Sequence, residues 1–310
     1  MPYTDVNILN VGRGSCAVVE SPSGRKSMID INDGGELREA AGMSVATRFL
    51  QEAAIKSLKS RLVDPVAWCK RYGITQLWRF ILSHPDADHM AGLRRILSGE
   101  LRTDNFWDIP HNRARSARSD FKNDSEYADW QTYQQLRDGT LPGAPRLLNP
   151  LRGDANQYWI DDDLEILSPT AALVADCDKA DVYNDASYVL RVAHGPSSVL
   201  LPGDVESKAW NDMIDVGLDL SADVLVASHH GRKSGYSEAA MNAIRPSVVI
   251  ISTDKLDPAH DAESDYRKWT KYVYSTRKEG TLWVRMDDDG SFDIYSEAGK
   301  LTGFVRRRAA

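Results

Sequence analysis

Short apolar runs alternate with turn residues over the first thirty positions and again over the second half of the chain. In the first thirty residues, glycine, serine and proline separate three such runs, which is typical of a β-meander. In the second half, runs with the character of strands recur at regular intervals, with helical patterns between several of them. The predicted strands are 164–167, 188–192, 199–201, 224–227, 248–251, 282–284 and 292–295, and the predicted helices are 206–216, 237–244 and 265–272.

Helical spacing of apolar residues also marks the first half. It predicts a long helix over 37–62 and another over 65–72. Residues 77–82 form an apolar run that predicts a strand, and after a polar loop the pattern over 90–97 predicts a further helix. Because strands come first and then alternate with helices in each half, we expect an α/β protein of two similar halves, packed sheet against sheet with the helices outside.

The composition changes between residues 105 and 150, where polar, aromatic and charged residues prevail and a helix is predicted over 125–137. We interpret 105–150 as an insertion or lid, and 255–310 as additional C-terminal elements. One domain over 1–310 with these additions is then favoured over two independent domains. The arginines, lysine and aromatic residues of 105–150 would suit contacts with a nucleic-acid backbone and its bases, or with a protein partner. A solvated amphipathic helix is an equally good interpretation. The residues in question are His111, Arg113, Arg115, Arg118, Phe121, Lys122, Tyr127, Trp130 and Tyr133.

Charge and cysteine content narrow the classes of protein. With 38 Lys and Arg against 45 Asp and Glu, the formal net charge of −7 argues against a protein that coats nucleic acid through bulk positive charge. A nuclease remains open, because metal ions can supply local positive charge. Three dispersed cysteines indicate neither a disulfide framework nor a zinc ribbon. With no signal peptide and no apolar run of about 20 residues, we expect a cytoplasmic protein without a membrane partner.

Candidate metal ligands are concentrated in the segment SHPDADHMAG, which holds His84, Asp86, Asp88 and His89 within six positions. Imidazole and carboxylate groups suit Zn²⁺, Mn²⁺ and Fe²⁺. A loop after a strand can direct the first two of these side chains to one ion and the last two to another. The alternative is a helix N-terminus capped by one of the aspartates. We favour metal ligation, because so many ionisable groups in one turn would otherwise need partners.

Two more apolar strands end in potential ligands. The run VLLPG leads to Asp204, and the run DVLVAS leads to His229 and His230. A Gly-Asp pair alone is more often a turn, and a pair of histidines is more often exposed. Three strands that all end in possible ligands are harder to explain without a site, since functional residues concentrate where loops leave a rigid sheet.

These motifs, in their order along the chain, resemble the metallo-β-lactamase superfamily, and in particular its ComEC/Rec2-like branch. The resemblance rests on HPDADH with MAG, LLPGD, ASHHG and PSVVIIST, and on an N-terminal glycine turn followed by a strand that ends at Asp30. It covers about residues 5 to 255. It implies an αββα sandwich of two mixed β-sheets with outer helices, and two divalent metal ions.

The resemblance also implies a ligand set. It assigns His84 and Asp86 to the first ion. It assigns Asp88 and His89 to the second ion, and Asp204 to a position between the two ions. His230 is the first choice for the closing ligand and His229 the second; the remaining histidine would face a phosphoryl oxygen or protonate the leaving group. The implied ligands are His84, Asp86, Asp88, His89, Asp204 and His230, and the implied catalytic residues are Asp88, Asp204 and His229.

The sequence departs from the superfamily in two places. Asp86 stands where histidine is commonest, and residues 182–187 lack the histidine that many members contribute, so we expect Asn184 or Asp185 to approach the site instead. More oxygen ligands shift the preference toward Mn²⁺, so both Zn²⁺ and Mn²⁺ stay open. Three further side chains are expected near the site, besides Asp30: Arg232, Lys233 and His260.

The resemblance favours a metal-dependent phosphodiesterase or nuclease, with DNA as the substrate and hydroxide activated between two metal ions. Two alternatives remain. One is a hydrolase of a small phosphodiester, such as a cyclic nucleotide or a phosphocholine ester. The other is a non-catalytic binding component of a larger complex, with 105–150 as its contact surface.

Overall fold

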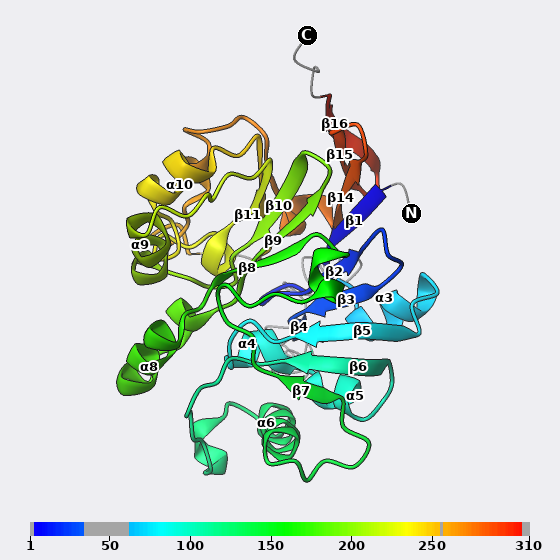
Figure 1. Ribbon diagram of the computed structural model, residues 1–310, viewed down its shortest axis with the longest axis vertical. Helices are drawn as coiled ribbons and strands as arrows, with labels where there is room; N and C mark the ends of the chain where they lie inside the picture. The colour runs from blue at the N-terminus through cyan, green and yellow to red at the C-terminus, as the bar shows by residue number, and fades with distance from the viewer. Residues whose placement is uncertain (1–2, 34–61, 255–256, 306–310) are drawn as a thin grey trace, which may run out of the picture.

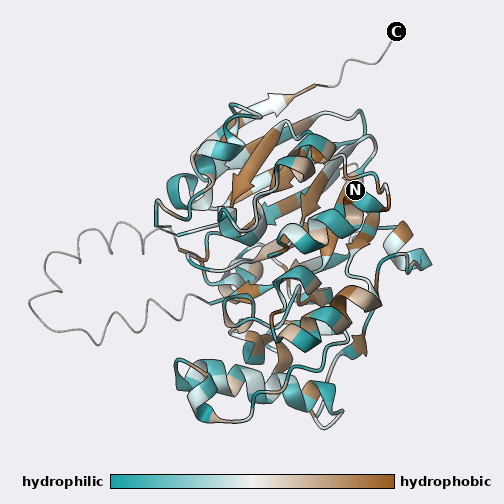
Figure 2. Cartoon of the chain, turned by 90° about the vertical axis from the view of Figure 1, so that its left-hand side faces the viewer, coloured by the Kyte–Doolittle hydropathy of each residue, from teal (hydrophilic) through white to brown (hydrophobic). Residues whose placement is uncertain are grey.

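Two β-sheets face each other in the structure, a computed structural model that describes residues 3–33, 62–254 and 257–305 (Figure 1). The helix predicted over 37–62 lies almost wholly outside these residues, as do the C-terminal arginines 306–308. Hydrophobic residues gather on the strands between the layers, and hydrophilic residues gather on the outer helices (Figure 2). Each sheet therefore buries one face against the other and its second face under helices.

The first sheet has nine strands in the order β16-β15-β14-β1-β2-β3-β5-β6-β7. The strands β1, β2 and β3 are antiparallel neighbours, which confirms the predicted β-meander. The strands β3, β5, β6 and β7 run parallel. Near it, β4 (Ile31–Asn32) pairs with the segment Met90–Ala91. The strands are β1 (Tyr3–Ile8), β2 (Ala17–Glu20), β3 (Lys26–Ile29), β5 (Gln76–Ile81), β6 (Arg102–Trp107), β7 (Arg146–Leu148), β14 (Leu282–Asp287), β15 (Phe292–Ser296) and β16 (Gly299–Phe304).

The second sheet has six strands in the order β13-β12-β11-β10-β9-β8. The strands β8, β9 and β10 are antiparallel neighbours, whereas β10 to β13 run parallel, so this sheet is mixed as well. The strands are β8 (Leu164–Ser168), β9 (Val189–His194), β10 (Ser197–Leu201), β11 (Val224–Val226), β12 (Val248–Ile251) and β13 (Val273–Ser275).

Three apolar cores hold the layers together. The first lies between the sheets, the second lies under α3, α5 and α6 on the first sheet, and the third lies under α9, α10 and α11 on the second. This arrangement confirms the αββα sandwich. The helices are α3 (Pro65–Arg71), α4 (Ala87–Met90), α5 (Leu93–Leu97), α6 (Asp124–Arg137), α7 (Gln157–Ile160), α8 (Ala171–Ala180), α9 (Ser207–Asp215), α10 (Glu238–Ile244), α11 (Glu263–Tyr266) and α12 (Thr276–Glu279).

Some predicted elements have different limits. The helix predicted over 90–97 is two short helices, because the backbone turns at Gly92 with φ of 94°. The helix predicted over 265–272 ends at Tyr266 in α11. The segments 105–150 and 255–310 both contribute strands to the first sheet, namely β6, β7 and β14 to β16. Among the described residues, no helix is long and apolar enough to cross a bilayer.

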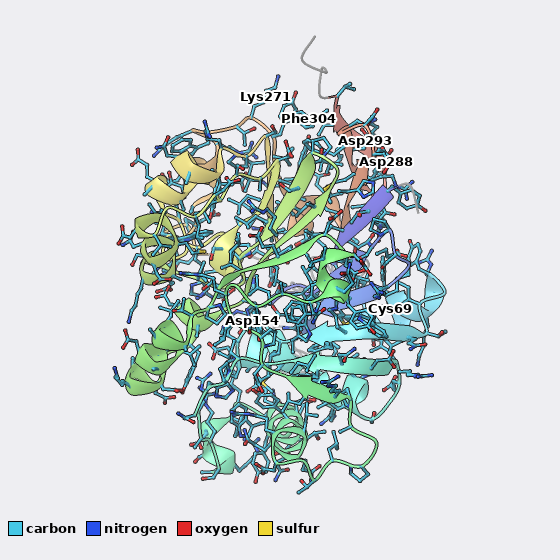
Figure 3. The ribbon with its side chains drawn as sticks, viewed as in Figure 1. Cys69, Asp154, Lys271, Asp288, Asp293 and Phe304 are labelled. Atoms are coloured by element: carbon cyan, nitrogen blue, oxygen red, sulfur yellow. The ribbon has the colours of Figure 1, made fainter. Side chains whose placement is uncertain are left out.

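His194 ends β9 at the hairpin turn to β10, and it is a buried structural residue. Its Nε2 is 2.8 Å from Oδ1 of Asp288, beside the C-terminal strands (Figure 3). Its Nδ1 is 3.2 Å from the hydroxyl of Thr4. This histidine therefore joins the two sheets at a place that contains none of the candidate ligands.

Candidate metal centre

The candidate ligands follow three strands that end at the same side of the sandwich. His84 to His89 lie in the loop after β5 and in α4, and Asp204 follows β10. His230 lies in a short 3-10 helix, η4 (Ser228–Gly231), directly after β11. Both histidines of η4 have positive φ, 49° at His229 and 57° at His230, a conformation that side chains larger than glycine rarely adopt. Such strained backbone is concentrated at functional sites.

Five of these side chains form two overlapping groups. One potential ligand atom of each of His84, His89 and Asp204 lies within 4.8 Å of the others, and the same holds for Asp88, His89 and His230. His89 belongs to both groups. Its Nε2 is 3.2 Å from Nε2 of His230 and 3.2 Å from Oδ2 of Asp204. The structure thus brings together residues that are up to 146 positions apart, from His84 to His230.

Hydrogen bonds fix which nitrogen of each ring faces the centre. Nδ1 of His89 is 2.7 Å from Oδ2 of Asp30, and Nδ1 of His230 is 3.2 Å from the carbonyl oxygen of Ser252. Both oxygens can only accept, so both Nδ1 atoms carry hydrogen. Each ring therefore turns its Nε2 toward the other ring and toward Asp204, and this Nε2 offers a lone pair when the ring is neutral. Nε2 of His84 is buried without a hydrogen-bond partner among the described residues. Converging lone pairs of this kind fit a cation.

The charged groups around the centre also favour a bound cation. Burial disfavours ionised Asp204, but His230 and His89 outweigh burial and hold the pKa of Asp204 well below its usual range. Burial likewise opposes a charge on His89, yet Asp204 and Asp30 raise the pKa of His89 well above its usual value. In the apo protein, protons on the histidines compensate the buried carboxylates. A divalent ion would take over that role when it displaces the protons.

Asp30, expected near the site, supports it from behind rather than lining it. This residue is 1% exposed, and its oxygens accept hydrogen bonds from the backbone N–H of Ser83 at 2.7 Å and from the Ser83 hydroxyl at 2.8 Å. A third bond, from Nδ1 of His89, orients that ring. A carboxylate behind a ligating histidine fixes its tautomer and increases its basicity.

We expect the substitution Asp30→Asn to weaken divalent-metal affinity by roughly 10- to 100-fold, since the amide no longer increases the basicity of His89. Isothermal titration with Zn²⁺ and with Mn²⁺ measures the change. Asp162→Asn is the matched control, because Asp162 is also 1% exposed but pairs with Arg79 away from the ligands. Equal affinity in wild type and Asp30→Asn would contradict the role of Asp30.

Asp86 belongs to neither group of ligand atoms. It forms an ion pair with Arg113, which also donates to the carbonyl oxygen of Pro85 at 2.7 Å. The side chain of Arg113 is 5% exposed and lies 4.9 Å over the ring of Tyr183. The predicted role of Asp86 as a ligand therefore requires that this ion pair opens or shares the carboxylate. Sequence spacing gave no sign of the pair.

The aromatic residues of 105–150 are mostly buried, so the expectation that they stack on bases is wrong for three of them. Phe121, Trp130 and Tyr133 are 8%, 2% and 0% exposed and belong to the core between α6 and the first sheet. Trp130 and Tyr133 are three positions apart on α6, which is the spacing of one helix face. This spacing is the signal that could have identified them as core residues. His111 is also buried, with Nε2 2.7 Å from the hydroxyl of Tyr133.

His229 faces Glu206, a residue that the sequence analysis missed. Nδ1 of His229 is 3.0 Å from Oε1 of Glu206, and its Nε2 is 3.7 Å from Oδ2 of Asp204. Burial lowers the pKa of His229, and the charge of Arg232 acts in the same direction. This arrangement leaves His229 outside both ligand groups and His230 inside one of them. Glu206 follows Asp204 by two positions, which is the one signal in the sequence that could have pointed to it.

The remaining residues expected near the site have other contacts. Asp185 accepts hydrogen bonds from the backbone N–H groups of Glu206 and Ala209, so its carboxylate caps α9 instead of replacing a histidine ligand. The side-chain amide of Asn184 lies 3.5 Å from Oε1 of Glu206. His260 is exposed and accepts a backbone hydrogen bond from Lys233 through its carbonyl oxygen. Lys233 is exposed as well.

The αββα sandwich, with candidate ligands in the loops after β5, β10 and β11, has the architecture of the metallo-β-lactamase fold. The chain is 26% identical to ComE operon protein 3 of Bacillus subtilis over 296 residues, 94% of this chain and 34% of the relative. It is 29% identical to Recombination protein 2 of Haemophilus influenzae over 196 residues, 63% of this chain and 20% of the relative. These similarities confirm the resemblance to the ComEC/Rec2-like branch.

Other comparisons add little. The chain spans about a third and a fifth of the length of these two relatives. No protein-family model matches the chain. A solved diphosphatase of the PhnP family is similar with a TM-score of 0.44 at 8% identity, and the match covers 88% of this chain and 94% of that one.

Proposed function

We propose that this protein is a metal-dependent phosphodiesterase that cleaves DNA, with two divalent ions, Zn²⁺ or Mn²⁺, at the centre described above. The observation that carries the proposal is the pair of Nε2 atoms of His89 and His230, 3.2 Å apart, whose lone pairs converge on Asp204. The overlap of the two ligand groups at His89 favours two ions close together. Two divalent ions held side by side by these residues would suit in-line displacement at phosphorus.

When bound, divalent ions supply Lewis acidity, which makes water nucleophilic near neutral pH and stabilises charge on a phosphoryl group. The chain itself orients the donors: Asp30 and Ser252 hold the two imidazole rings. Glu206 can only accept from Nδ1 of His229, so Nε2 of His229 keeps a lone pair and can take up a proton beside Asp204. Its lowered pKa keeps His229 neutral, and therefore ready to accept, at pH 7.

The choice of DNA rests on two supports. One of the relatives is named a recombination protein, and recombination is a reaction of DNA. In this chain, Arg232 and Lys233 follow the histidine pair after a single glycine, where cations suit a phosphate backbone. Arg232 is half-buried and close enough to His229 for its charge to act on that ring.

Digestion of single- and double-stranded DNA with Mn²⁺ or Zn²⁺ tests the proposal, with EDTA as the metal-free control. We expect cleavage by the wild type. The cleavage rate should fall roughly a thousandfold or more in Asp88→Ala and in Asp204→Ala, because the substitution of any one residue of a catalytic unit removes most of its activity. No cleavage under either metal, or equal cleavage by these variants, would refute it. Cleavage of bis-p-nitrophenyl phosphate but not of DNA would favour a small phosphodiester as the substrate.

A further inference from the structure

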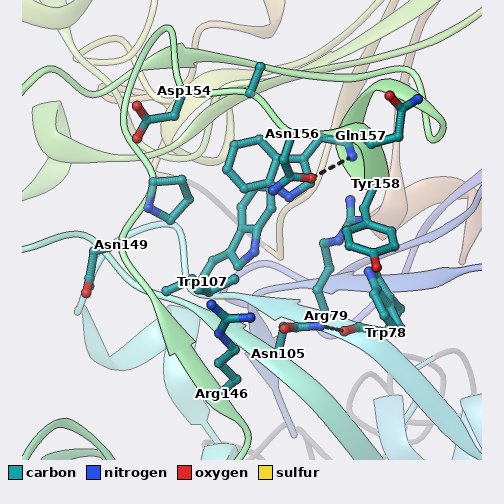
Figure 4. A pocket seen from close by; sticks show the side chains of 14 residues that line it. Trp78, Arg79, Asn105, Trp107, Arg146, Asn149, Asp154, Asn156, Gln157 and Tyr158 are labelled. Carbon is teal, nitrogen blue, oxygen red and sulfur yellow. Dashed lines mark hydrogen bonds between the residues drawn. The ribbon is translucent and has the colours of Figure 1, made fainter.

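A cavity of about 740 Å³ opens at the β7 edge of the first sheet, apart from the candidate metal centre (Figure 4). Its walls come from β5, β6 and β7 and from the segment 149–159, which passes over them and includes α7. Its lining, as far as the structure describes it, includes none of the candidate metal ligands. The volume lies within the range of about 300–1,000 Å³ that is common for small-molecule sites.

Aromatic rings form one wall and the floor of this cavity. The rings of Trp78 and Tyr158 have centroids 5.3 Å apart, and Tyr158 is 51% exposed. The guanidinium of Arg25 lies 4.9 Å from the Tyr158 ring and 5.4 Å from the Trp78 ring, which holds the pair in place. Trp107 lies at the floor (Figure 4). The cavity thus presents preformed ring surfaces next to solvent.

Polar groups face the same space. Asn105 donates its amide hydrogen to the carbonyl oxygen of Trp78 at 2.8 Å, which leaves its Oδ1 as an acceptor toward the cavity (Figure 4). Arg146 is exposed and forms no ion pair within the described ranges of the chain. At the floor, Arg79 is 1% exposed, pairs with Asp162 and keeps its Nη1 without a hydrogen-bond partner among the described residues.

The acidic groups nearby leave Arg146 without compensation. The carboxylate of Asp162 is shared by Arg79 and Arg25, and Asp161 lies 3.7 Å from Arg25. Asp154, the acidic residue in the lining, accepts a backbone hydrogen bond from Leu151 and lies across the cavity from Arg146 (Figure 4). An anion therefore has a free cationic partner at the mouth, beside the aromatic wall. A neutral sugar would use the rings and leave Arg146 unpaired.

We propose that this cavity binds a nucleotide unit, with its base stacked on Trp78 and Tyr158, a base donor on Oδ1 of Asn105 and its phosphate on Arg146. Aromatic stacking beside a cation is the common chemistry of single-strand recognition. The nucleotide can belong to a DNA strand or be free. The inference goes beyond the proposed function, since binding here needs neither a metal ion nor cleavage.

Titration of the full chain with oligonucleotides in EDTA tests the site, because EDTA removes the ions that cleavage needs. The readout is tryptophan fluorescence, which reports on Trp78 and Trp107. The probes are a ten-residue oligothymidylate, an abasic oligonucleotide of the same length, and thymidine monophosphate. We expect quenching by the oligothymidylate and affinity about tenfold lower in Tyr158→Ala and in Arg146→Ala, as for the loss of one stacked base or one phosphate contact. Both positions are exposed, so the fold tolerates the changes.

Two control variants match these substitutions. Tyr72→Ala removes a tyrosine that is also 51% exposed but ends α3, and Arg102→Ala removes an exposed arginine at the other end of β6. Both should bind like the wild type. Binding of the oligonucleotide alone assigns the site to a strand, and equal binding of the monophosphate assigns it to free nucleotides.

Three results would overturn the inference: no quenching by either thymidine probe, equal affinity for the abasic strand, or wild-type affinity in Tyr158→Ala and Arg146→Ala. Any of them combined with metal-dependent cleavage of DNA by the wild type would discard this cavity and leave the proposed function intact. Binding in EDTA without any cleavage under Mn²⁺ or Zn²⁺ would refute the proposed function and leave the inference about this cavity intact.

Discussion

Replacing His89 with alanine should leave less than one divalent ion per chain and reduce DNA cleavage by roughly a thousandfold or more. His89 is the one residue shared by the two ligand groups, so its loss removes a donor from each of them. It also leaves Asp30 and Asp204 buried without the imidazole that joins them. Metal content per folded chain, measured by inductively coupled plasma mass spectrometry, is the primary readout.

Three further variants separate metal loss from unfolding. His89→Gln keeps most of the volume, and circular dichroism establishes that it is folded. His84→Ala affects one ligand group alone, so about one ion per chain should remain. His194→Gln changes a buried histidine that contacts Asp288 and Thr4, and it should bind metal like the wild type. Full metal content in His89→Gln and His89→Ala would disprove the shared role of His89.

The substitution Asp108→Asn should make the stability of the protein depend strongly on pH. Burial raises the pKa of Asp108 to about 7, whereas burial, with Arg137 and Arg113, lowers the pKa of His111 to about 3. Between about pH 4 and 6.5, folding therefore adds a proton to Asp108 and removes one from His111, since both groups are charged in the unfolded chain. In the wild type the two effects cancel, so this pair gives almost no net slope.

Without Asp108, no proton gained on folding balances the proton that His111 loses, so His111 alone determines how this pair changes the stability with pH. A base whose pKa is lowered by folding stabilises the protein above the unfolded pKa of about 6.5, and this stabilisation is lost as the pH falls. The free energy of unfolding of Asp108→Asn should therefore rise by up to ~1.4 kcal/mol per pH unit between about pH 4.5 and 6.5, relative to the wild type. Urea denaturation at several pH values measures this slope.

The reverse substitution gives the opposite sign. In His111→Gln, Asp108 alone remains, and the stability should fall as the pH rises toward 7. Asp104→Asn on β6 is the control, since Asp104 is partly exposed and hydrogen-bonded to Gln76. Parallel pH profiles of all three variants and the wild type would show that Asp108 and His111 do not titrate as a pair.

The sequence was sufficient for the sandwich and for the grouping of most candidate ligands, because both follow from local patterns. Strands such as 248–251 are continuous apolar runs, and functional side chains concentrate in the loops that leave the ends of such strands. Contacts that depend on packing could not be predicted. The pair of Arg113 and Asp86 joins residues 27 positions apart, and its geometry depends on how the segment after β6 folds back over the loop.

Short elements also gave no usable signal. Both β7 and β13 have three residues, too few to establish a period of two, and they were missed. The sequence left open whether Trp130 and Tyr133 form a binding surface or pack against the core. Aromatic residues among charges suggest a binding surface, but on an amphipathic helix such as α6 they are the face that meets the core.

The place of β1 in the first sheet affects how the protein can fold. This strand pairs on one side with β2 and on the other with β14, with Tyr3 opposite Asp287 and Ile8 opposite Leu282. During synthesis, one edge of β1 therefore has no partner until some 280 further residues have left the ribosome. Such distant pairing slows folding and leaves a strand edge open to other chains. A chain arrested before β14 should therefore depend on chaperones, whatever the state of its metal centre.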